Sequence, residues 1–161
     1  MACLAAYNNG YLHGAWIDAD QDAWAIQDGI NAMLRTSSIP EAEEWAIHDY
    51  EGFEGVRLSE YAGIEMVTSL AAFVAEHGRL GAELITYYGS LDEARDAITD
   101  QYAGEYASLA DFAEAITEET TTIPETLRFY IDYDRMARDM AISDVIAIET
   151  AHDQVHVFWS R

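Results

Sequence analysis

An excess of acidic residues is the feature that most constrains how this chain can fold. Its 161 residues include 30 Asp and Glu but only eight arginines and no lysine, so the formal net charge is −22. Charged side chains are rarely buried without a partner, and the eight cations cannot pair with so many carboxylates. Half of the residues are hydrophobic, which is enough for folded cores and unlike a disordered acidic tail. The charge therefore belongs to a folded surface.

The acidic residues are spread along the whole chain. Residues 1–60 carry 11 acids and 2 arginines, residues 61–103 carry 7 and 2, and residues 104–161 carry 12 and 4. No segment is a detachable acidic tail. This balance argues against direct binding of nucleic acid, which needs a positively charged surface, and against binding to anionic membranes.

Cysteine content and hydropathy bear on the compartment. Cys3 is the only cysteine, so no disulfide can form within the chain, and a reducing compartment is expected. We find no basic-then-apolar leader and no apolar run long enough to cross a bilayer. We expect a soluble, cytoplasmic protein.

The first third of the sequence predicts a small sheet with one helix. Residues 3–7 and 12–17 have the character of two short strands around the Asn-Asn-Gly turn at 8–10, and residues 45–50 indicate a third strand. Apolar residues recur at helical spacing over residues 22–34, and Asp20 or Asp22 is a candidate for the N-cap.

The middle of the chain predicts helices. Residues 64–77 present one apolar helical face that stops at Gly78, and a shorter helix over about 80–88 ends at Gly89. Two later segments begin with Ser-Leu and carry an acid three residues after the serine, which is the pattern of a helix start: Ser90 with Glu93, and Ser108 with Asp111.

The last third predicts a helix followed by a β-hairpin. Pro124 lies near a helix start, and Tyr133, Met136, Ala137 and Met140 share one face of the next helix. Residues 145–149 and 154–159 are typical of paired strands. We therefore predict an α+β protein in three subdomains: an N-terminal sheet with one helix (1–60), a helical middle (61–103) and a C-terminal α/β part (104–161).

Catalytic, metal and cofactor motifs are weak. Residues 18–29 begin like a calcium loop but have Ala23 and Gly29 where an EF-hand needs Gly and Glu. His152 and His156 have the spacing of a zinc pair on a helix, yet their surroundings alternate like a strand. No glycine-rich phosphate loop or nucleophile motif is present. We predict no enzyme activity and no cofactor.

Carboxylates recur at helical spacing. Asp92, Asp96 and Asp100 are four residues apart, and Asp111, Glu114 and Glu118 follow a similar pattern. Only the acids in a first helical turn gain from the helix dipole, so the later ones need another explanation. By contrast, helical spacing predicts that arginines partly neutralise three later acids, in the pairs 132–135, 134–138 and 135–139.

The segment 43–55 gathers acids around three aromatic residues. Burial of Trp45, Tyr50 and Phe53 would hold the neighbouring glutamates outward on a rigid scaffold. The alternative is that Asp49 or Glu51 serves as a structural hydrogen-bond partner.

Three accounts of the whole charge remain. Adaptation to high salt favours an acidic surface that lacks lysine, and a coding bias towards Ala and Arg explains the missing lysine but not the acids. The third account is imitation of nucleic acid. Duplex DNA carries one charge per about 1.7 Å of axis, so 22 charges correspond to roughly 37 Å, about one helical turn.

A known family shares several motifs with this sequence, in the same order. They are AAYNNG (5–10) with Gly14-Ala15-Trp16, DYEGF (49–53), IPETL (123–127), YIDYDRMARDM (130–140) and VHVF (155–158). Over essentially its whole length the chain resembles the ArdA antirestriction family. That resemblance implies a DNA mimic, encoded on mobile genetic elements, that inhibits type I restriction–modification enzymes by occupying their DNA-binding groove. It also implies a curved, elongated, three-part protomer that forms a homodimer through its C-terminal part.

Function in this family is distributed over surface acids, without catalytic residues. We predict that the mimic surface includes Asp18, Asp20, Asp22, Asp28, Glu43, Glu44, Glu51, Glu54, Glu83, Asp92, Asp96, Asp100, Asp111, Glu114 and Glu118. The competing hypotheses are an acidic decoy for another basic DNA-binding protein, a housekeeping protein of a salt-loving organism, and an enzyme of an unrecognised type.

Overall fold

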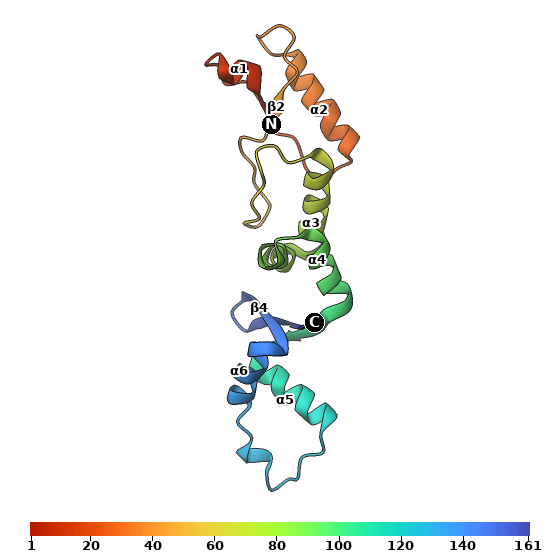
Figure 1. Cartoon of the computed structure of the whole chain (residues 1–161), viewed down its shortest axis with the longest axis vertical. Coiled ribbons are helices and arrows are strands. Elements are labelled where there is room, and N and C mark those ends of the chain that lie inside the picture. The colour runs from red at the N-terminus through yellow and green to blue at the C-terminus, as the bar shows by residue number, and fades with distance from the viewer. The chain divides into compact units, whose positions relative to one another are not determined.

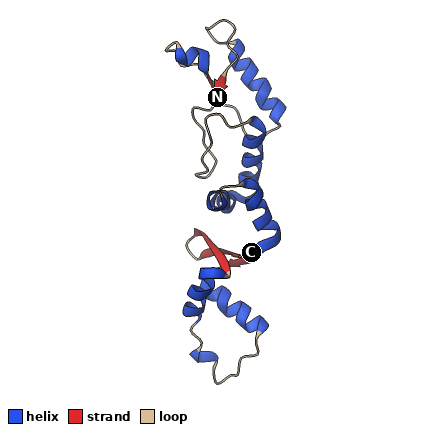
Figure 2. Cartoon of the chain, in the orientation of Figure 1, coloured by secondary structure: helices blue, strands red, loops and turns tan.

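A computed structural model describes residues 1–161, with a small antiparallel sheet near each end of the sequence and helices between them (Figure 2). The predicted α+β class is confirmed. The chain divides into two units, Met1–Ala82 and Glu83–Arg161 (Figure 1). We call them the N-terminal and C-terminal units. The predicted division into three subdomains stays a prediction.

The N-terminal sheet consists of two short strands, β1 (Ala2–Cys3) and β2 (Trp45–Ala46), which pair antiparallel. Our prediction of a longer strand over residues 45–50 was therefore wrong beyond its first two residues. After Ala46 the chain forms a loop whose backbone folds on itself, and Ile47 N–H donates to the Glu60 carbonyl at 2.9 Å.

The predicted strand at residues 3–7 is a short helix, α1 (Leu4–Asn8). Its Leu-Ala-Ala sequence favours a helix, and the Asn-Gly pair ends that helix instead of forming a hairpin turn: Gly10 has φ +81°. The predicted strand over 12–17 is reduced to a single bridge between Ala2 and Gly14. There the backbones approach so closely that a Cβ on Gly14 would lie 2.5 Å from the Met1 carbonyl oxygen.

The predicted helix at 22–34 is confirmed as α2 (Ala23–Arg35). Its apolar face buries Ile26, Ile30 and Met33 against Cys3 and Ala6, which forms the core beneath the two-stranded sheet. Ile17 of the loop that precedes α2 packs against the same core, and this loop carries three acids of the predicted surface, Asp18, Asp20 and Asp22.

Helix α3 (Ile64–Tyr88) is interrupted at Gly78, which has φ +56° and ψ −139°. The predicted stop at Gly78 and the predicted end at Gly89, with φ +69°, are both confirmed. The part of α3 before Gly78 buries Val67, Leu70, Phe73 and Val74 in the N-terminal unit. Glycine reaches positive φ without the penalty of a Cβ.

In the C-terminal unit, α4 (Leu91–Asp96) continues into a π-helical turn, η1 (Ala97–Gln101), and then into strand β3 (Tyr102–Tyr106). The strand was not predicted. Its side chains are all exposed or half-buried, and they form neither an apolar run nor a strict alternation. Pairing with a later strand, not local pattern, makes this segment extended.

The predicted C-terminal hairpin is confirmed as β4 (Val145–Ala151) and β5 (Gln154–Trp159), and β3 pairs with β5, so the sheet order is β3-β5-β4. Helices α5 (Leu109–Thr120) and α6 (Tyr133–Ser143) accompany this sheet (Figure 1). A 3₁₀ turn, η2 (Arg128–Tyr130), lies between them, and Pro124 precedes this turn rather than an α-helix. The core of the unit contains Phe112, Val145 and Val157. No helix in the structure is long and apolar enough to cross a membrane.

Candidate functional site

Nearly all of the acidic residues are exposed. Of the 30 acidic residues, every one is exposed except Glu83, which is half-buried. The predicted surface residues follow the same rule, because 14 of the 15 are exposed. The acids lie in both units, so each unit presents a strongly negative surface of its own.

Acids of the loop before α2 are held by local hydrogen bonds. The Asp18 carboxylate accepts a hydrogen bond from Asp20 N–H at 3.0 Å, and the Asp22 carboxylate accepts one from the Trp24 indole at 3.2 Å. Asp22 occupies the N-cap position of α2 but its side chain does not cap the helix. Asp28 is exposed on α2 itself.

The segment 43–55 presents its glutamates outward as predicted, but of its three aromatic residues only Phe53 is buried, whereas Trp45 and Tyr50 are half-buried. Phe53 is buried, and its ring meets the Tyr50 ring edge to face at a centroid distance of 5.9 Å. The Tyr50 hydroxyl accepts a hydrogen bond from Leu58 N–H at 3.1 Å, which closes the loop. The glutamates of this segment point into solvent: Glu43, Glu44, Glu51 and Glu54.

Asp49 also has a structural contact. Its carboxylate accepts a hydrogen bond from Tyr50 N–H at 2.9 Å, as the alternative hypothesis for this segment proposed. The contact is local and leaves the side chain exposed. Asp49 can therefore stabilise the turn and still contribute negative charge to the surface.

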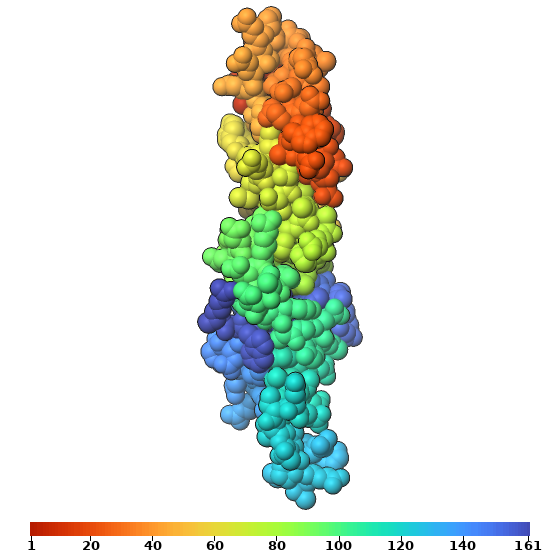
Figure 3. Space-filling model, turned by 90° about the vertical axis from the view of Figure 1, so that its right-hand side faces the viewer, coloured from red at the N-terminus to blue at the C-terminus, as the bar shows by residue number.

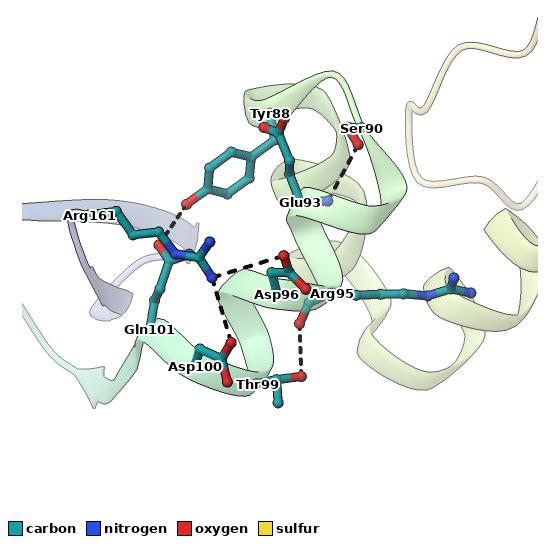
Figure 4. Close-up of polar contacts among 9 residues, drawn as sticks. All are labelled: Tyr88, Ser90, Glu93, Arg95, Asp96, Thr99, Asp100, Gln101 and Arg161. Carbon is teal, nitrogen blue, oxygen red and sulfur yellow. Dashed lines mark hydrogen bonds and ion pairs between the residues drawn. The ribbon is translucent and has the colours of Figure 1, made fainter.

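Arginines lie within ion-pair distance of three acids of α4 and η1, namely Asp92, Asp96 and Asp100. The Arg161 guanidinium lies 3.9 Å from the Asp96 carboxylate and 3.6 Å from that of Asp100 (Figure 4). Arg95 lies 3.6 Å from Asp92. The spacing of these three aspartates indicated a row of carboxylates without counter-charge, and that interpretation was wrong. For Asp96 and Asp100 the counter-charge comes from Arg161, far away in the sequence, which helical spacing cannot reveal, whereas Arg95 and Asp92 are an i,i+3 pair on α4.

Gln101 extends this ion-pair cluster. With its amide turned so that both ends are satisfied, its oxygen accepts a hydrogen bond from Arg161 Nε at 3.0 Å and its nitrogen donates to the Trp159 carbonyl at 3.1 Å. The Tyr88 hydroxyl lies 3.3 Å from the same amide (Figure 4). Burial raises the pKa of Tyr88, with further contributions from neighbours that include Tyr87. Arg161 is thus held by several groups at once.

The predicted helix starts at Ser90 and Ser108 are confirmed. The Ser90 hydroxyl accepts from Glu93 N–H at 3.3 Å, and the Ser108 hydroxyl accepts from Asp111 N–H at 3.1 Å. Asp111 is therefore occupied by capping, since its carboxylate also accepts from the Ser108 hydroxyl at 2.6 Å. Each cap satisfies a backbone donor that the helix leaves open.

Farther along α5, Glu118 and Glu114 have different surroundings. Glu118 pairs with Arg128 at 3.1 Å, whereas Glu114 has no ion pair. Glu114 is exposed and therefore remains available as a surface charge.

The predicted ion pairs of residues 132–139 do not form. Asp132 instead caps α6, its carboxylate accepting from Arg135 N–H at 2.9 Å. Neither Arg135 nor Arg138 has a carboxylate within 4.0 Å. In water such pairs stabilise little and cost side-chain freedom, so correct spacing does not guarantee contact.

His152 and His156 do not lie on one face of a helix, which their four-residue spacing would require for a zinc pair. His152 lies in the turn between β4 and β5, next to Asp153, whereas His156 is buried on β5. The Tyr102 hydroxyl and Nδ1 of His156 are 2.9 Å apart. Burial lowers the pKa of His156, and the Glu105 carboxylate, 3.8 Å from Nε2, opposes that shift. No group of three or more His, Cys, Asp or Glu side chains is placed to hold a metal ion.

Comparison with known families decides the assignment. The family model described as antirestriction protein (ArdA) matches residues 1–154 of the 161. The chain belongs to the ArdA antirestriction family. A search of curated proteins found no match. ArdA membership implies an antirestriction role and interaction with restriction enzymes, and ArdA is not a known enzyme family. The resemblance noted from the sequence motifs is thereby confirmed.

Proposed function

We propose that this protein is a DNA mimic that inhibits type I restriction–modification enzymes by occupying their DNA-binding groove with its surface carboxylates. The observation that carries the proposal is the exposure of every acidic residue but one in a folded chain of net charge −22. A groove that binds DNA is lined with arginine and lysine, which attract carboxylates by the same Coulomb interaction as phosphates.

Fixed positions of the carboxylates support the proposal further. The acids stand on helices and on loops closed by hydrogen bonds, such as Asp18 with Asp20 and Tyr50 with Leu58. Binding therefore orders fewer side chains than a flexible acidic tail would require, and less affinity is lost to conformational entropy. Association is expected to be fast and to weaken with added salt.

The acids differ in how freely they can meet a basic partner. Asp92, Asp96, Asp100 and Glu118 already have an arginine within ion-pair distance. Predicted surface residues with neither an ion pair nor a capping role are expected to contribute most, namely Asp18, Asp20, Asp22, Asp28, Glu43, Glu44, Glu51, Glu54 and Glu114.

Homodimer formation through the C-terminal part belongs to the same proposal. Three large apolar side chains of this unit are almost fully exposed: Phe129, Tyr130 and Ile142. Burying such side chains between two copies would remove them from water, and a dimer would double the charge offered to the enzyme. Sedimentation equilibrium of the wild-type chain and of the Phe129→Ser variant tests this: a monomeric wild type contradicts it.

The decisive experiment is DNA cleavage by a purified type I enzyme with increasing amounts of this protein. We expect complete inhibition at low salt, relief of inhibition by added competitor DNA, and weaker inhibition as salt rises. No inhibition at large excess in low salt would refute the proposal. A gel-shift control with DNA alone should show no complex, since this protein is expected to bind the enzyme and not nucleic acid.

A pull-down from host lysate distinguishes inhibition of a restriction enzyme from the alternative hypothesis, an acidic decoy for another basic DNA-binding protein. Retention of a different basic DNA-binding protein, together with no effect on the restriction enzyme, would favour that alternative.

A further inference from the structure

The N-terminal unit contains an open cavity of about 610 Å³. The inner lining is apolar, and Ile47, Phe53, Val67 and Val74 are all buried. Side chains near residue 20, orange-red in Figure 3, adjoin the surface of α3 on this part of the molecule. The cavity thus exposes apolar surface between the loop before α2 and the helix α3.

Carboxylates surround the open side of this cavity. Its exposed lining includes five acids: Asp18, Asp20, Asp49, Glu51 and Glu54. No arginine or histidine lines it. Met1 is among the lining residues, and its amino group donates to the Ala15 carbonyl at 3.0 Å. The cavity therefore combines an apolar interior with an entrance that attracts cations.

Local structure holds this entrance in place. Glu54 has φ +49°, in the left-handed region that a residue with a Cβ rarely adopts, and Gly52 has φ +79° beside it. The Tyr50–Leu58 hydrogen bond described above closes the same loop. Trp16, which is 67% exposed, contributes an aromatic face to the lining. An arginine or lysine can stack on such a face while its charge meets the carboxylates.

We propose that this cavity binds a segment of the protein target in which one apolar side chain is flanked by arginine or lysine. The inference rests on the proposed function, because it takes the partner to be a basic protein. Charge complementarity selects the basic residues, and the apolar lining selects the side chain between them. DNA presents phosphates to the enzyme's groove but has no such apolar cavity. Burial of the apolar side chain in this cavity would therefore add affinity that salt does not weaken.

A cavity-filling variant tests the proposal without changing the net charge. Ala75 lines the cavity on α3 and is exposed, so Ala75→Phe places a ring in the opening. Ala72→Phe is the matched control, because Ala72 is exposed on the same helix and does not line the cavity. Circular dichroism establishes that both variants fold.

Inhibition of a type I enzyme is measured for both variants over a range of salt concentrations. We expect Ala75→Phe to weaken inhibition roughly tenfold at every salt concentration, with the salt dependence unchanged. Ala72→Phe should match the wild type. Equal inhibition by the two variants overturns the cavity proposal and leaves the DNA-mimic proposal intact, whereas a wild type that does not inhibit refutes the latter.

A peptide measurement examines the cavity independently of the enzyme. Two synthetic peptides are compared, one with leucine between arginines and one with serine in that place, by the NMR shift of the Trp16 indole N–H. We expect the leucine peptide to bind at least tenfold more tightly. Equal binding of the two peptides, or no binding of either, overturns the proposal.

If Ala75→Phe does not fold, Trp16→Ala replaces it in the inhibition assay. Tyr61→Ala is then the control, since Tyr61 is 70% exposed in the loop before α3 and does not line the cavity. Weaker inhibition by Trp16→Ala alone supports the proposal, and equal inhibition by the two variants overturns it.

Discussion

The two units present their acids in different ways. In the N-terminal unit, loops carry many of the carboxylates, and neither Arg35 nor Arg57 forms an ion pair. In the C-terminal unit, the acids stand mainly on helices, and Arg95, Arg128 and Arg161 each pair with one or two of them. The acidic side chains are exposed to a similar extent in both units, but the two units differ in how many of these acids pair with an arginine.

This difference shows that exposure alone does not define an available charge. A carboxylate beside an arginine must give up that contact before it can meet a partner's cation, so its net contribution to binding is smaller. The four carboxylates that pair with arginine in the C-terminal unit are therefore expected to contribute less to binding than unpaired ones, although that unit carries 17 acids against 13 in the N-terminal unit.

The largest expected effect concerns the independence of the units. Phe112 is 1% exposed in the C-terminal core, and Phe112→Ala should lower the free energy of unfolding of that unit by about 3–5 kcal/mol through lost burial and a cavity. Hydrogen exchange followed by mass spectrometry should show faster exchange after residue 83 and little change before it. Leu12→Ala, at a side chain that is 94% exposed, is the control. Equal loss of protection in both units would show that they unfold together.

The next effect tests the difference in available charge. Changing Glu43, Glu44, Glu51 and Glu54 to Gln removes four unpaired charges, whereas changing Asp92, Asp96, Asp100 and Glu118 to the amides removes four paired ones. At roughly 0.2–1 kcal/mol per exposed contact, the first set should weaken inhibition about fivefold to several-hundredfold. The second set should weaken it less. Inhibition constants measured at equal ionic strength decide between them, and a larger loss from the second set would reverse the comparison.

A smaller effect is expected at Arg161. Arg161→Gln leaves Asp96 and Asp100 without their shared cation, which should lower the free energy of unfolding by about 0.2–1 kcal/mol because the cluster is exposed. The same variant should inhibit more strongly at low salt, since two carboxylates become available. Urea unfolding and the cleavage assay measure the two effects. Arg138→Gln removes a charge without an ion pair, so a stability loss as large as that of Arg161→Gln would contradict the role assigned to Arg161.

The smallest effect is a pH dependence confined to the C-terminal unit. Because burial lowers the pKa of His156 below its unfolded value, the unfolded state binds the extra proton first. Stability is full above the unfolded pKa, about 6.5, and declines as the pH falls from there towards the folded pKa. Unfolding of wild type and His156→Gln between pH 7.5 and 6 should show this decline in the wild type only. His152→Gln, at a fully exposed turn position, should retain it.

Local sequence signals predicted much of the C-terminal fold and the ends of the helices. Ser90 and Ser108 accept the predicted backbone hydrogen bonds, and Gly78 and Gly89 adopt positive φ where the helical face stops. Each of these depends on a few adjacent residues. Residues 3–7 were predicted wrongly because apolar residues before an Asn-Gly pair suit a short helix as well as a strand.

The amino-acid sequence by itself determined the family, the α+β class and the outward position of the carboxylates, because thirty acids with eight arginines cannot be buried. Only the tertiary structure decided that Arg161 pairs with Asp96 and Asp100, where β3 pairs, and that residues of two loops, 16–20 and 49–58, line an open cavity together with α3. These features join residues that are far apart in the chain. Their contacts depend on packing and on the competition between partners, which no local pattern records.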